Sequence, residues 1–493
     1  MSFAIAAGHD ATADTALEIL KSGGNAFDAA IAAMMTAFAA EPGMASCGGG
    51  AFANVRKAGD QCLIYDFFSQ TPKYKRPVGE IDFFPIEVDF GTTIEVFHVG
   101  KGATAVPGMI AGLLTIHEQL GTIPLNRLVE IPIQYAKEGV QINQFQYYDY
   151  KLLENIFRID PKAQPIFFKD GVLKNVGETI KMPGLADFLD LMAKEGAAAF
   201  YKGEIAGKII RDYKEGGGYL SQEDFDDYEV IIRQPLEFEY KGKTIFTNPF
   251  PSIGGKLIAH TMHFLEEESL SSEVLGNEHL KKLYKALQKT DALGKSSHDL
   301  KSSLNEILNK NKKHGSTTQF SIVDKWDNAI SLTMTIGEGC GYFVENTDIQ
   351  MNNMLGEAAL LPNGFHSWDP DIRLSSMMAP TIVLGQNQRT EIVTGSAGAS
   401  RIASAISQLL HYLIDYKVSV EQAVNFPRVH LEHGVFNIES GFKHNLASTD
   451  FKEEFKEWDS KSLFFGGVHT ILSRKGSLYA SGDDRRDGVI RIE

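Results

Sequence analysis

The hydrophobic residues near the start of the chain are spaced as in buried helices. Residues 11–21 carry an apolar side chain at every third or fourth position, which predicts a helix with one buried face. Gly23 and Gly24 end this helix, and the alanine-rich residues 26–40 predict a second helix that is buried on all sides. Its apolar run is far shorter than the ~20 residues that a membrane span needs. We therefore expect two packed helices and no membrane partner.

Other parts of the chain show the two-residue period of β-strands. Residues 51–55, 61–66 and 236–246 alternate apolar with polar positions, or concentrate β-branched and aromatic residues, and predict strands. Residues 103–235 are predicted to be mostly helical, and a further helix is expected over 256–265, after a loop rich in Gly and Pro. By its length of 493 residues the chain could hold two to four ordinary domains or one large α/β unit, and 43% hydrophobic residues are ample for a sizeable core.

Residues 266–316 differ from the rest of the chain. They are rich in Glu, Lys and Ser and almost free of aromatic residues, which predicts one or two amphipathic surface helices and then a solvated, charged linker. Over the whole chain, 63 acidic residues outnumber 48 basic ones, and the formal net charge is −15. This balance argues against a nucleic-acid partner and against binding to an anionic membrane.

The cysteines and glycine-rich turns do not build a recognisable cofactor site. Cys47, Cys62 and Cys340 are too widely spread for a CxxC motif or a disulfide framework and are predicted to be small buried hydrophobes. No Lys follows the glycines at 48–50, and no His and Asp residues cluster at ligand spacing, so neither a P-loop nor a metal site is expected. The N-terminus lacks the basic region of a signal peptide, which favours a cytoplasmic location, or a periplasmic one if a leader was removed.

Two adjacent threonines, Thr317 and Thr318, follow the charged segment and begin a run with alternating apolar residues. Most such pairs simply fill the surface of a strand. A threonine at a new N-terminus, however, carries nucleophile and base in one residue, because its hydroxyl attacks and its free amine accepts the proton. Cleavage of the chain between Ser316 and Thr317 is therefore a candidate reaction, alongside the purely structural interpretation.

An ordered series of motifs supports the chemical interpretation. The chain resembles the γ-glutamyltranspeptidase family of N-terminal-nucleophile hydrolases in the segments 17–30, 48–50, 106–108, 248–255, 374–377 and 393–401. The resemblance implies an α+β fold, a four-layer αββα sandwich, folded as one large unit. It also implies a precursor that is cut into residues 1–316 and 317–493, which stay together as a heterodimer and could pair further. No metal or organic cofactor is implied.

The resemblance also assigns catalytic roles. Thr317 matches the nucleophile, which first attacks the carbonyl of Ser316 and later forms an acyl-enzyme with an amide substrate. Thr335 matches a second threonine that hydrogen-bonds the nucleophile, although a threonine in a strand needs no such role. Gly398 and Ala399 match two glycines whose backbone N–H groups form an oxyanion hole, and the extra methyl group is tolerated unless the position demands a positive φ.

The residues implied in substrate binding match less well. Ser375 and Ser376 match a pair that binds the α-carboxylate of a γ-glutamyl substrate, and Arg373 beside them is either a further contact or a surface charge. Glu357 roughly matches the aspartate that holds the substrate ammonium group.

Three departures weaken the assignment of the substrate. Phe68 stands where the family has a carboxylate-binding arginine, which removes both a charge and a hydrogen-bond fork. Gly337 replaces a frequent asparagine, and Gln319 replaces a histidine two residues after the nucleophile. A γ-glutamyl amide such as glutathione is the first hypothesis for the substrate. Another acyl amide, or a non-catalytic binding protein, remains an alternative.

Overall fold

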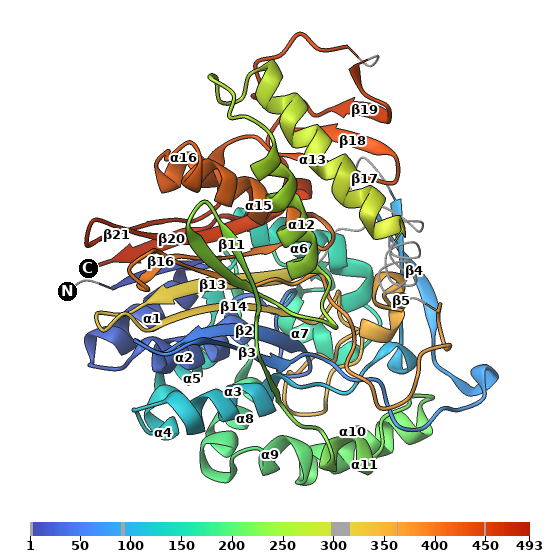
Figure 1. Ribbon diagram of the computed structural model, residues 1–493. Coiled ribbons are helices and arrows are strands. Elements are labelled where there is room, and N and C mark those ends of the chain that lie inside the picture. The colour runs from blue at the N-terminus through green and yellow to red at the C-terminus, as the bar shows by residue number, and fades with distance from the viewer. Residues whose placement is uncertain (1–2, 90–93, 297–315, 362, 448–449) are drawn as a thin grey trace.

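Two large antiparallel sheets lie one on the other at the centre of the structure, a computed structural model that describes residues 3–89, 94–296, 316–361, 363–447 and 450–493 (Figure 1). The first sheet has seven strands in the spatial order β10 (Ile231–Arg233), β3 (Cys62–Phe67), β2 (Gly50–Arg56), β14 (Ala329–Thr335), β13 (Thr317–Val323), β1 (Ala4–Ala7) and β22 (Val489–Ile492). The second sheet has six, in the order β11 (Leu236–Tyr240), β12 (Lys243–Thr247), β15 (Thr381–Leu384), β16 (Thr390–Ala397), β20 (Gly467–Arg474) and β21 (Ser477–Ser481). Both sheets combine strands from before and after Thr317.

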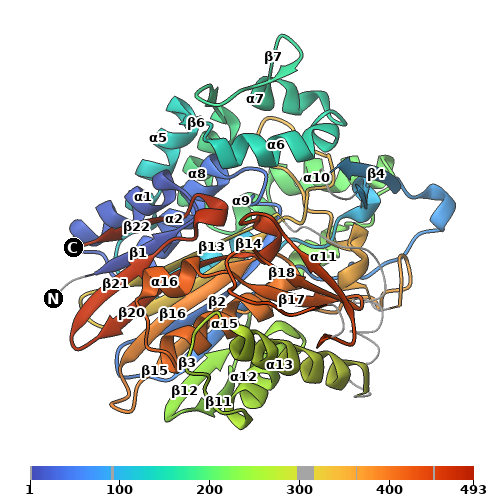
Figure 2. The same cartoon turned by 90° about the horizontal axis from the view of Figure 1, so that it is seen from above.

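Helices cover the two outer faces of this pair of sheets, as the two views together show (Figures 1 and 2). The group on the side of the seven-stranded sheet comprises α1 (Asp10–Lys21), α2 (Ala26–Ala40), α3 (Met109–Leu120), α5 (Glu130–Glu138) and α8 (Pro183–Glu195). The group on the other side comprises α12 (Gly254–Glu267), α13 (Asn277–Ser296), α15 (Arg401–Ile414) and α16 (Val420–Asn425). A small sheet of β17 (Val429–Glu432), β18 (Val435–Ile438) and β19 (Glu454–Glu457) packs beside α13.

Polar side chains link the two sheets through their interface. Ser331 donates a hydrogen bond to the carbonyl of Thr394 at 2.7 Å, and Ser321 donates one to the carbonyl of His469 at 2.9 Å. Gln319 lies fully buried between them and donates to the hydroxyl of Ser321 at 2.9 Å. Because a buried polar group is costly unless it is paired, these bonds specify how the sheets are stacked as well as stabilising them.

A single contact fixes helix α6 (Gln144–Phe157) against the end of α2. Asn143 and Gln146 form a capping box at the start of α6, in which each side chain accepts a hydrogen bond from the other residue's backbone N–H. The amide of Gln146 also donates to the carbonyl of Ala40, the last residue of α2. This contact brings the buried face of α6 next to Glu41 and the beginning of β13.

The early helices and strands predicted from sequence are confirmed, with bounds that differ by no more than one residue. The single strand predicted over 236–246 is wrong, because it is a hairpin of β11 and β12. Lys241 and Gly242 turn the chain there with φ values of +49° and +73°. The alternation of charged and apolar residues continues through this turn, so periodicity alone could not reveal it.

The charged segment 266–316 is only partly a linker. Residues 277–296 form helix α13, whose buried leucines and Tyr284 pack against α12 and β17. This agrees with the amphipathic helix expected there and contradicts a linker over that part. The rest of the predicted linker, residues 297–315, lies outside the described residues.

Within the described parts of the chain, no helix is both long enough and apolar enough to cross a membrane. All three cysteines are buried free thiols, as the sequence predicted.

Candidate active site

Thr317 is the first residue of β13, a central strand with neighbours on both sides. The register places Thr317 directly opposite Thr335 of β14, and Thr335 in turn lies opposite Gly50 of β2. Thr317 is 6% exposed. Successive side chains of a strand point to opposite faces, so Thr317 points one way while Ser316 and Thr318 point the other.

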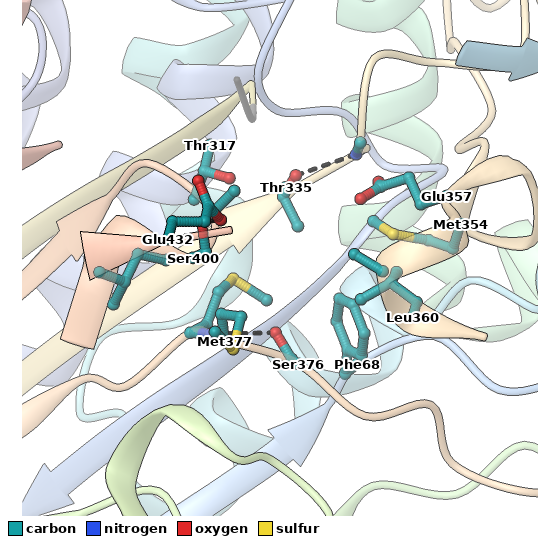
Figure 3. Close-up of a pocket in the computed structure, with 15 residues that line it drawn as sticks. Phe68, Thr317, Thr335, Met354, Glu357, Leu360, Ser376, Met377, Ser400 and Glu432 are labelled. Atoms are coloured by element: carbon teal, nitrogen blue, oxygen red, sulfur yellow. Dashed lines mark hydrogen bonds between the residues drawn. The ribbon is translucent and has the colours of Figure 1, made fainter. Parts of the chain in front are cut away.

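The hydroxyl of Thr335 holds the carbonyl of the peptide bond that precedes Thr317. It donates a hydrogen bond to the oxygen of Ser316 at 2.7 Å. It accepts one from the N–H of Gly337 at 2.9 Å (Figure 3). This differs from the predicted contact with the nucleophile itself. A donor on this oxygen polarises the carbonyl toward attack and stabilises the negative charge that attack would create.

Thr317 and Thr335 open into a pocket with largely apolar walls (Figure 3). The pocket is lined by Phe68, Thr317, Thr335, Gly337, Met354, Glu357, Ala359, Leu360, Ser376, Met377, Met378, Ala399, Ser400, Ile402 and Glu432. None of the described residues that line it is Lys or Arg. Phe68 stacks on Phe52 with ring centroids 5.3 Å apart, so its ring is fixed.

Arg373 does not line the pocket, because its guanidinium group forms hydrogen bonds to the backbone and to Tyr228 instead. It donates to the backbone carbonyls of Phe68 and Glu229 and to the hydroxyl of Tyr228. Its Nε also lies 3.6 Å from the buried carboxylate of Asp66. The structure therefore does not bring Arg373 to the other predicted substrate-binding residues. It supports the backbone that carries the Phe68 ring.

The two predicted serines are separated by the fold. Ser376 lines the pocket, where its hydroxyl accepts a hydrogen bond from the N–H of Met378 at 3.1 Å. Ser375 does not line the pocket, and its hydroxyl donates to the carbonyl of Pro251 at 2.8 Å. Only Ser376 is therefore placed to meet a substrate in this pocket.

Two carboxylates line the pocket on opposite sides in the view of Figure 3, Glu357 and Glu432. A Cβ atom added to Gly337 would lie 2.4 Å from Oε1 of Glu357, so glycine at 337 leaves the room that this carboxylate occupies. Glu432 accepts a hydrogen bond from Ser400. Burial alone would raise the pKa of Glu432, but His430 and the charge of Arg401 together hold it below its usual value.

Gly398 and Ala399 lie between β16 and α15, and Ala399 lines the pocket. Both residues have a positive φ, +123° for Gly398 and +50° for Ala399. The position of Ala399 therefore demands the left-handed conformation that favours glycine, and the alanine is a strained departure from the expected glycine pair.

Sequence analysis missed three residues that contact the start of β13 away from the pocket: Asp149, Glu41 and Arg486. Ser316 donates to Asp149 of α6 at 3.4 Å, and Thr318 donates to Glu41 at 2.7 Å. Arg486 donates to the carbonyl of Thr317 at 3.3 Å. Glu41 had one sequence signal, since it is an acid that directly follows a fully buried, alanine-rich helix. Asp149 shares the buried face of α6 with Gln146 and Tyr150.

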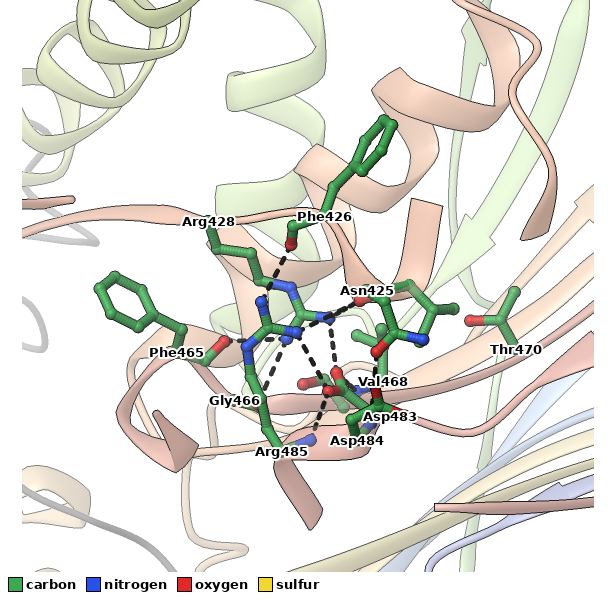
Figure 4. A network of polar contacts seen from close by, with 12 residues as sticks. Asn425, Phe426, Arg428, Phe465, Gly466, Val468, Thr470, Asp483, Asp484 and Arg485 are labelled. Carbon is green, nitrogen blue, oxygen red and sulfur yellow. Dashed lines mark hydrogen bonds and ion pairs between the residues drawn. The ribbon is translucent and has the colours of Figure 1, made fainter. Parts of the chain in front are cut away.

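A buried ion network holds the short helix η8 (Asp484–Arg486), which carries Arg486 (Figure 4). Asp483 accepts from Arg428 at 2.5 Å and from Arg485 at 3.1 Å, and the N–H of Val468 also donates to it at 2.9 Å. Arg485 pairs in turn with Glu439. Because the network is buried and its members pair with one another, it fixes the turn from which Arg486 reaches β13.

In the described part of the chain, no group of three or more His, Cys, Asp or Glu side chains is arranged to hold a metal ion.

Comparison with known proteins gives a consistent result over the whole chain. The sequence profile described as "Gamma-glutamyltranspeptidase" matches residues 12–289 and 262–492. The "Glutathione hydrolase proenzyme" of Escherichia coli is 28% identical over 97% of this chain and 89% of its own length. The "Acylase ACY 1 proenzyme" of a Pseudomonas species is 27% identical over 98% of this chain and 92% of its own length. The crystal structure of a cephalosporin acylase from Bacillus halodurans shares the fold, with a TM-score of 0.82 and 21% identity over 99% of this chain and 95% of that one.

Replacing Ala399 with glycine is expected to stabilise the protein. Alanine pays about 1–2 kcal/mol in the left-handed region, and part of this is offset by the greater freedom of glycine in the unfolded chain. We expect Ala399→Gly to raise the free energy of unfolding by about 0.5–1 kcal/mol, measured by urea denaturation. The matched control, Ala403→Gly within α15, should lower it by about 1 kcal/mol. A less stable Ala399→Gly protein would contradict the strain at this position.

Proposed function

Since the chain belongs to the γ-glutamyltranspeptidase family and is an enzyme of that family, we propose that it cuts itself between Ser316 and Thr317 and then acts as an N-terminal threonine amidohydrolase or acyltransferase. The support is the position of Thr317, at the start of a buried strand and facing a pocket, with the preceding carbonyl held by Thr335.

The cutting step follows from this geometry. The Thr317 hydroxyl oxygen attacks the carbonyl carbon of Ser316, and its proton passes to the departing nitrogen of Thr317 as the C–N bond breaks. Thr335 stabilises the oxyanion through its hydrogen bond to the Ser316 oxygen. The product is an ester between Ser316 and the Thr317 oxygen. Water hydrolyses this ester, leaving a carboxylate on Ser316 and a free amine on Thr317.

The same oxygen then reacts with the substrate. The freed amine, with a reference pKa of about 7.7–8.0, is suited to accept the proton of the Thr317 hydroxyl near neutral pH. Attack on an amide gives an acyl-enzyme and releases the amine half of the substrate. Water or another amine then takes the acyl group. The N–H groups of Gly398 and Ala399 remain our candidates for the oxyanion hole in this step.

We further propose that the acyl group carries no carboxylate. The observation that supports this is the pocket itself, in which Thr317 faces Phe68 and three methionines and no described lining residue is cationic. An anion buried there without a cationic partner would lose several kcal/mol of solvation free energy. Glu357 is placed to bind a positively charged amine. The substrate class is therefore an amide with an apolar or amine-bearing acyl group.

A γ-glutamyl amide such as glutathione is the second candidate. It is favoured by the named activity of the E. coli relative and by the presence of Ser376 and Glu357 in the pocket. Phe68 and the diversion of Arg373 count against it, because they leave the α-carboxylate of glutamate without its charge partner.

The two fragments are proposed to stay together as a heterodimer with the four-layer αββα arrangement of this enzyme class. In the seven-stranded sheet, β14 and β13 of the second fragment lie between β2 and β1 of the first. Separating the fragments would break four strand pairings, β1 with β13, β1 with β22, β2 with β14 and β12 with β15, and would expose the apolar face under α2. This costs far more than a typical folding free energy allows.

Self-cleavage is checked by intact mass measurement of the purified protein. We expect two species that divide between Ser316 and Thr317, and one full-length species for Thr317→Ala. Thr335→Val should cut about 100-fold more slowly, because it loses the donor to the scissile carbonyl. Thr335→Ser keeps the hydroxyl and should cut at a rate close to the wild type. A wild-type chain that stays intact after long incubation would overturn the proposal.

Acyl specificity is checked with four anilides that differ only in two charged groups: γ-glutamyl, 4-aminobutyryl, glutaryl and butyryl. We expect the 4-aminobutyryl and butyryl compounds, which lack a carboxylate, to have a higher kcat/KM than the γ-glutamyl and glutaryl compounds. Phe68→Arg should raise the ratio of γ-glutamyl to 4-aminobutyryl kcat/KM by about 10- to 100-fold, the equivalent of one charge-assisted hydrogen bond. Phe68→Leu is the apolar control and should leave this ratio unchanged. Preference of the wild type for γ-glutamyl anilide would restore the second candidate.

A further inference from the structure

The strand that carries the nucleophile has a second buried polar surface on the face away from the pocket. Three consecutive residues each contact one charged or titratable group there: Ser316 contacts Asp149, Thr317 contacts Arg486 through its carbonyl, and Thr318 contacts Glu41. The peptide nitrogen of Thr317 lies in the backbone between the two side chains that face these carboxyls. None of these groups takes part in the cutting step described above.

The carboxyl groups of Asp149 and Glu41 are deeply buried, and one oxygen of Asp149 has no hydrogen bond from a described residue. Oδ2 of Asp149 has no hydrogen-bond partner among the described residues, and the residue is 7% exposed. Glu41 is 2% exposed and accepts from Thr12 as well as from Thr318. Burial raises the pKa of Glu41 to about 7, and burial likewise raises the pKa of Asp149 to about 7. In the uncut chain Asp149 therefore lacks a donor to one of its oxygens, and burial disfavours the charged form of both carboxyls.

Cleavage of the chain supplies a positively charged hydrogen-bond donor. Cleavage creates an ammonium group on Thr317 and a carboxylate on Ser316. The new carboxylate and Asp149 repel each other, so Ser316 is driven away and takes its hydroxyl donor with it. Asp149 is then left with two empty acceptor oxygens, a buried state that costs about 1–3 kcal/mol or more unless a new donor arrives. The ammonium on Thr317, the residue that follows Ser316 in the chain, is the donor that cleavage creates.

We propose that Asp149 and Glu41 form the counter-ion site for the amine that cleavage frees on Thr317, and so position the general base of the mature enzyme. This inference rests on the proposed self-cleavage. It assigns to both carboxyls a positioning role, because they act on the substrate through the amine of Thr317.

Several other groups face this pair and set its balance of charge. Arg486 of η8 contributes a positive charge and contacts Thr317 itself. His469 of β20 lies next to Glu41 across Gly8, and burial lowers its pKa to about 4, so it is neutral. The hydroxyl of Tyr150, beside Asp149 on α6, is buried and has no hydrogen-bond partner among the described residues. Two carboxylates against one arginine leave a net negative charge when both are ionised, which favours the ammonium form of the amine.

The test is the pH dependence of kcat/KM for the mature enzyme on its best amide substrate. Activity rises with pH as the amine loses its proton, and the midpoint of this rise reports the pKa of the amine in the free enzyme. Removing a nearby negative charge destabilises the ammonium form, so Asp149→Asn should move the midpoint down by about 1 unit. Glu41→Gln should move it in the same direction. Tyr150→Phe, which removes a buried hydroxyl without changing the charge, is the matched control and should leave the midpoint in place.

A purely structural role would lower activity at every pH without moving the midpoint, and that result in both variants would overturn the proposal. Mass measurement separates this failure from failure of the proposed function, because a wild type that never splits removes both. If neither variant matures, carbamylation of the wild-type Thr317 amine by cyanate is followed against pH. A midpoint above the ordinary α-amine range of about 7.7–8.0 supports the counter-ion site, and one at or below that range overturns it.

Discussion

The register of β13 against β14 is the constraint on which the whole site depends. Seven consecutive pairs, from Thr317 opposite Thr335 to Val323 opposite Ala329, fix this register. Because side chains alternate, a slip of one residue would turn Thr318 into the pocket and press Thr317 against the buried carboxyls. The burial of both faces of the strand forbids such a slip, since every apolar residue would change sides with its polar neighbour. Two adjacent threonines can therefore have unrelated roles.

The same strand explains how a chain can be cut at its centre without falling apart. The bond before Thr317 lies at the very start of β13, so its loss removes no pair of the ladder. Strands from both sides of the proposed cut are interleaved in the sheet. Polar links between the two sheets join residues within the second fragment, such as Ser331 and Thr394, and also residues of different fragments, such as Arg56 and Thr390. The proposed cut would thus place Thr317 at a new chain end while its surroundings stay rigid, which is what preorganised catalysis requires.

Sequence reasoning predicted part of the pocket face and missed the carboxyls and the arginine on the other side of β13. Thr317, Thr335, Ala399 and Ser376 sit in motifs whose spacing is informative, and the structure places all four around one pocket. Asp149 and Arg486 are distant in sequence from Ser316 and Thr317 and follow no motif, so only the packing of α6 and η8 reveals them. The orientation of Arg373 was also beyond reach, because neighbouring residues of a loop can point to opposite sides. Likewise the sign of φ at Ala399, which turns a mild departure into a strained one, is a property of the folded backbone.

Arg373 shows how the proposed change of specificity would leave the proposed chemistry intact. A guanidinium group near the pocket would ordinarily recruit an anionic substrate, yet here it binds the carbonyl of Phe68 and the hydroxyl of Tyr228 and faces Asp66. Its charge is satisfied inside the protein, and its effect is to hold an aromatic ring in the wall of the pocket. Glu432 is compensated in the same way by Arg401 and His430. The charges of Arg373 and Arg401 are thus paired within the protein, and the pocket surface left for an acyl group includes Phe68, the methionines and Glu357. Neither of these pairings involves Thr317 or Thr335, so the residues proposed to break the amide bond are separate from those proposed to select the amide.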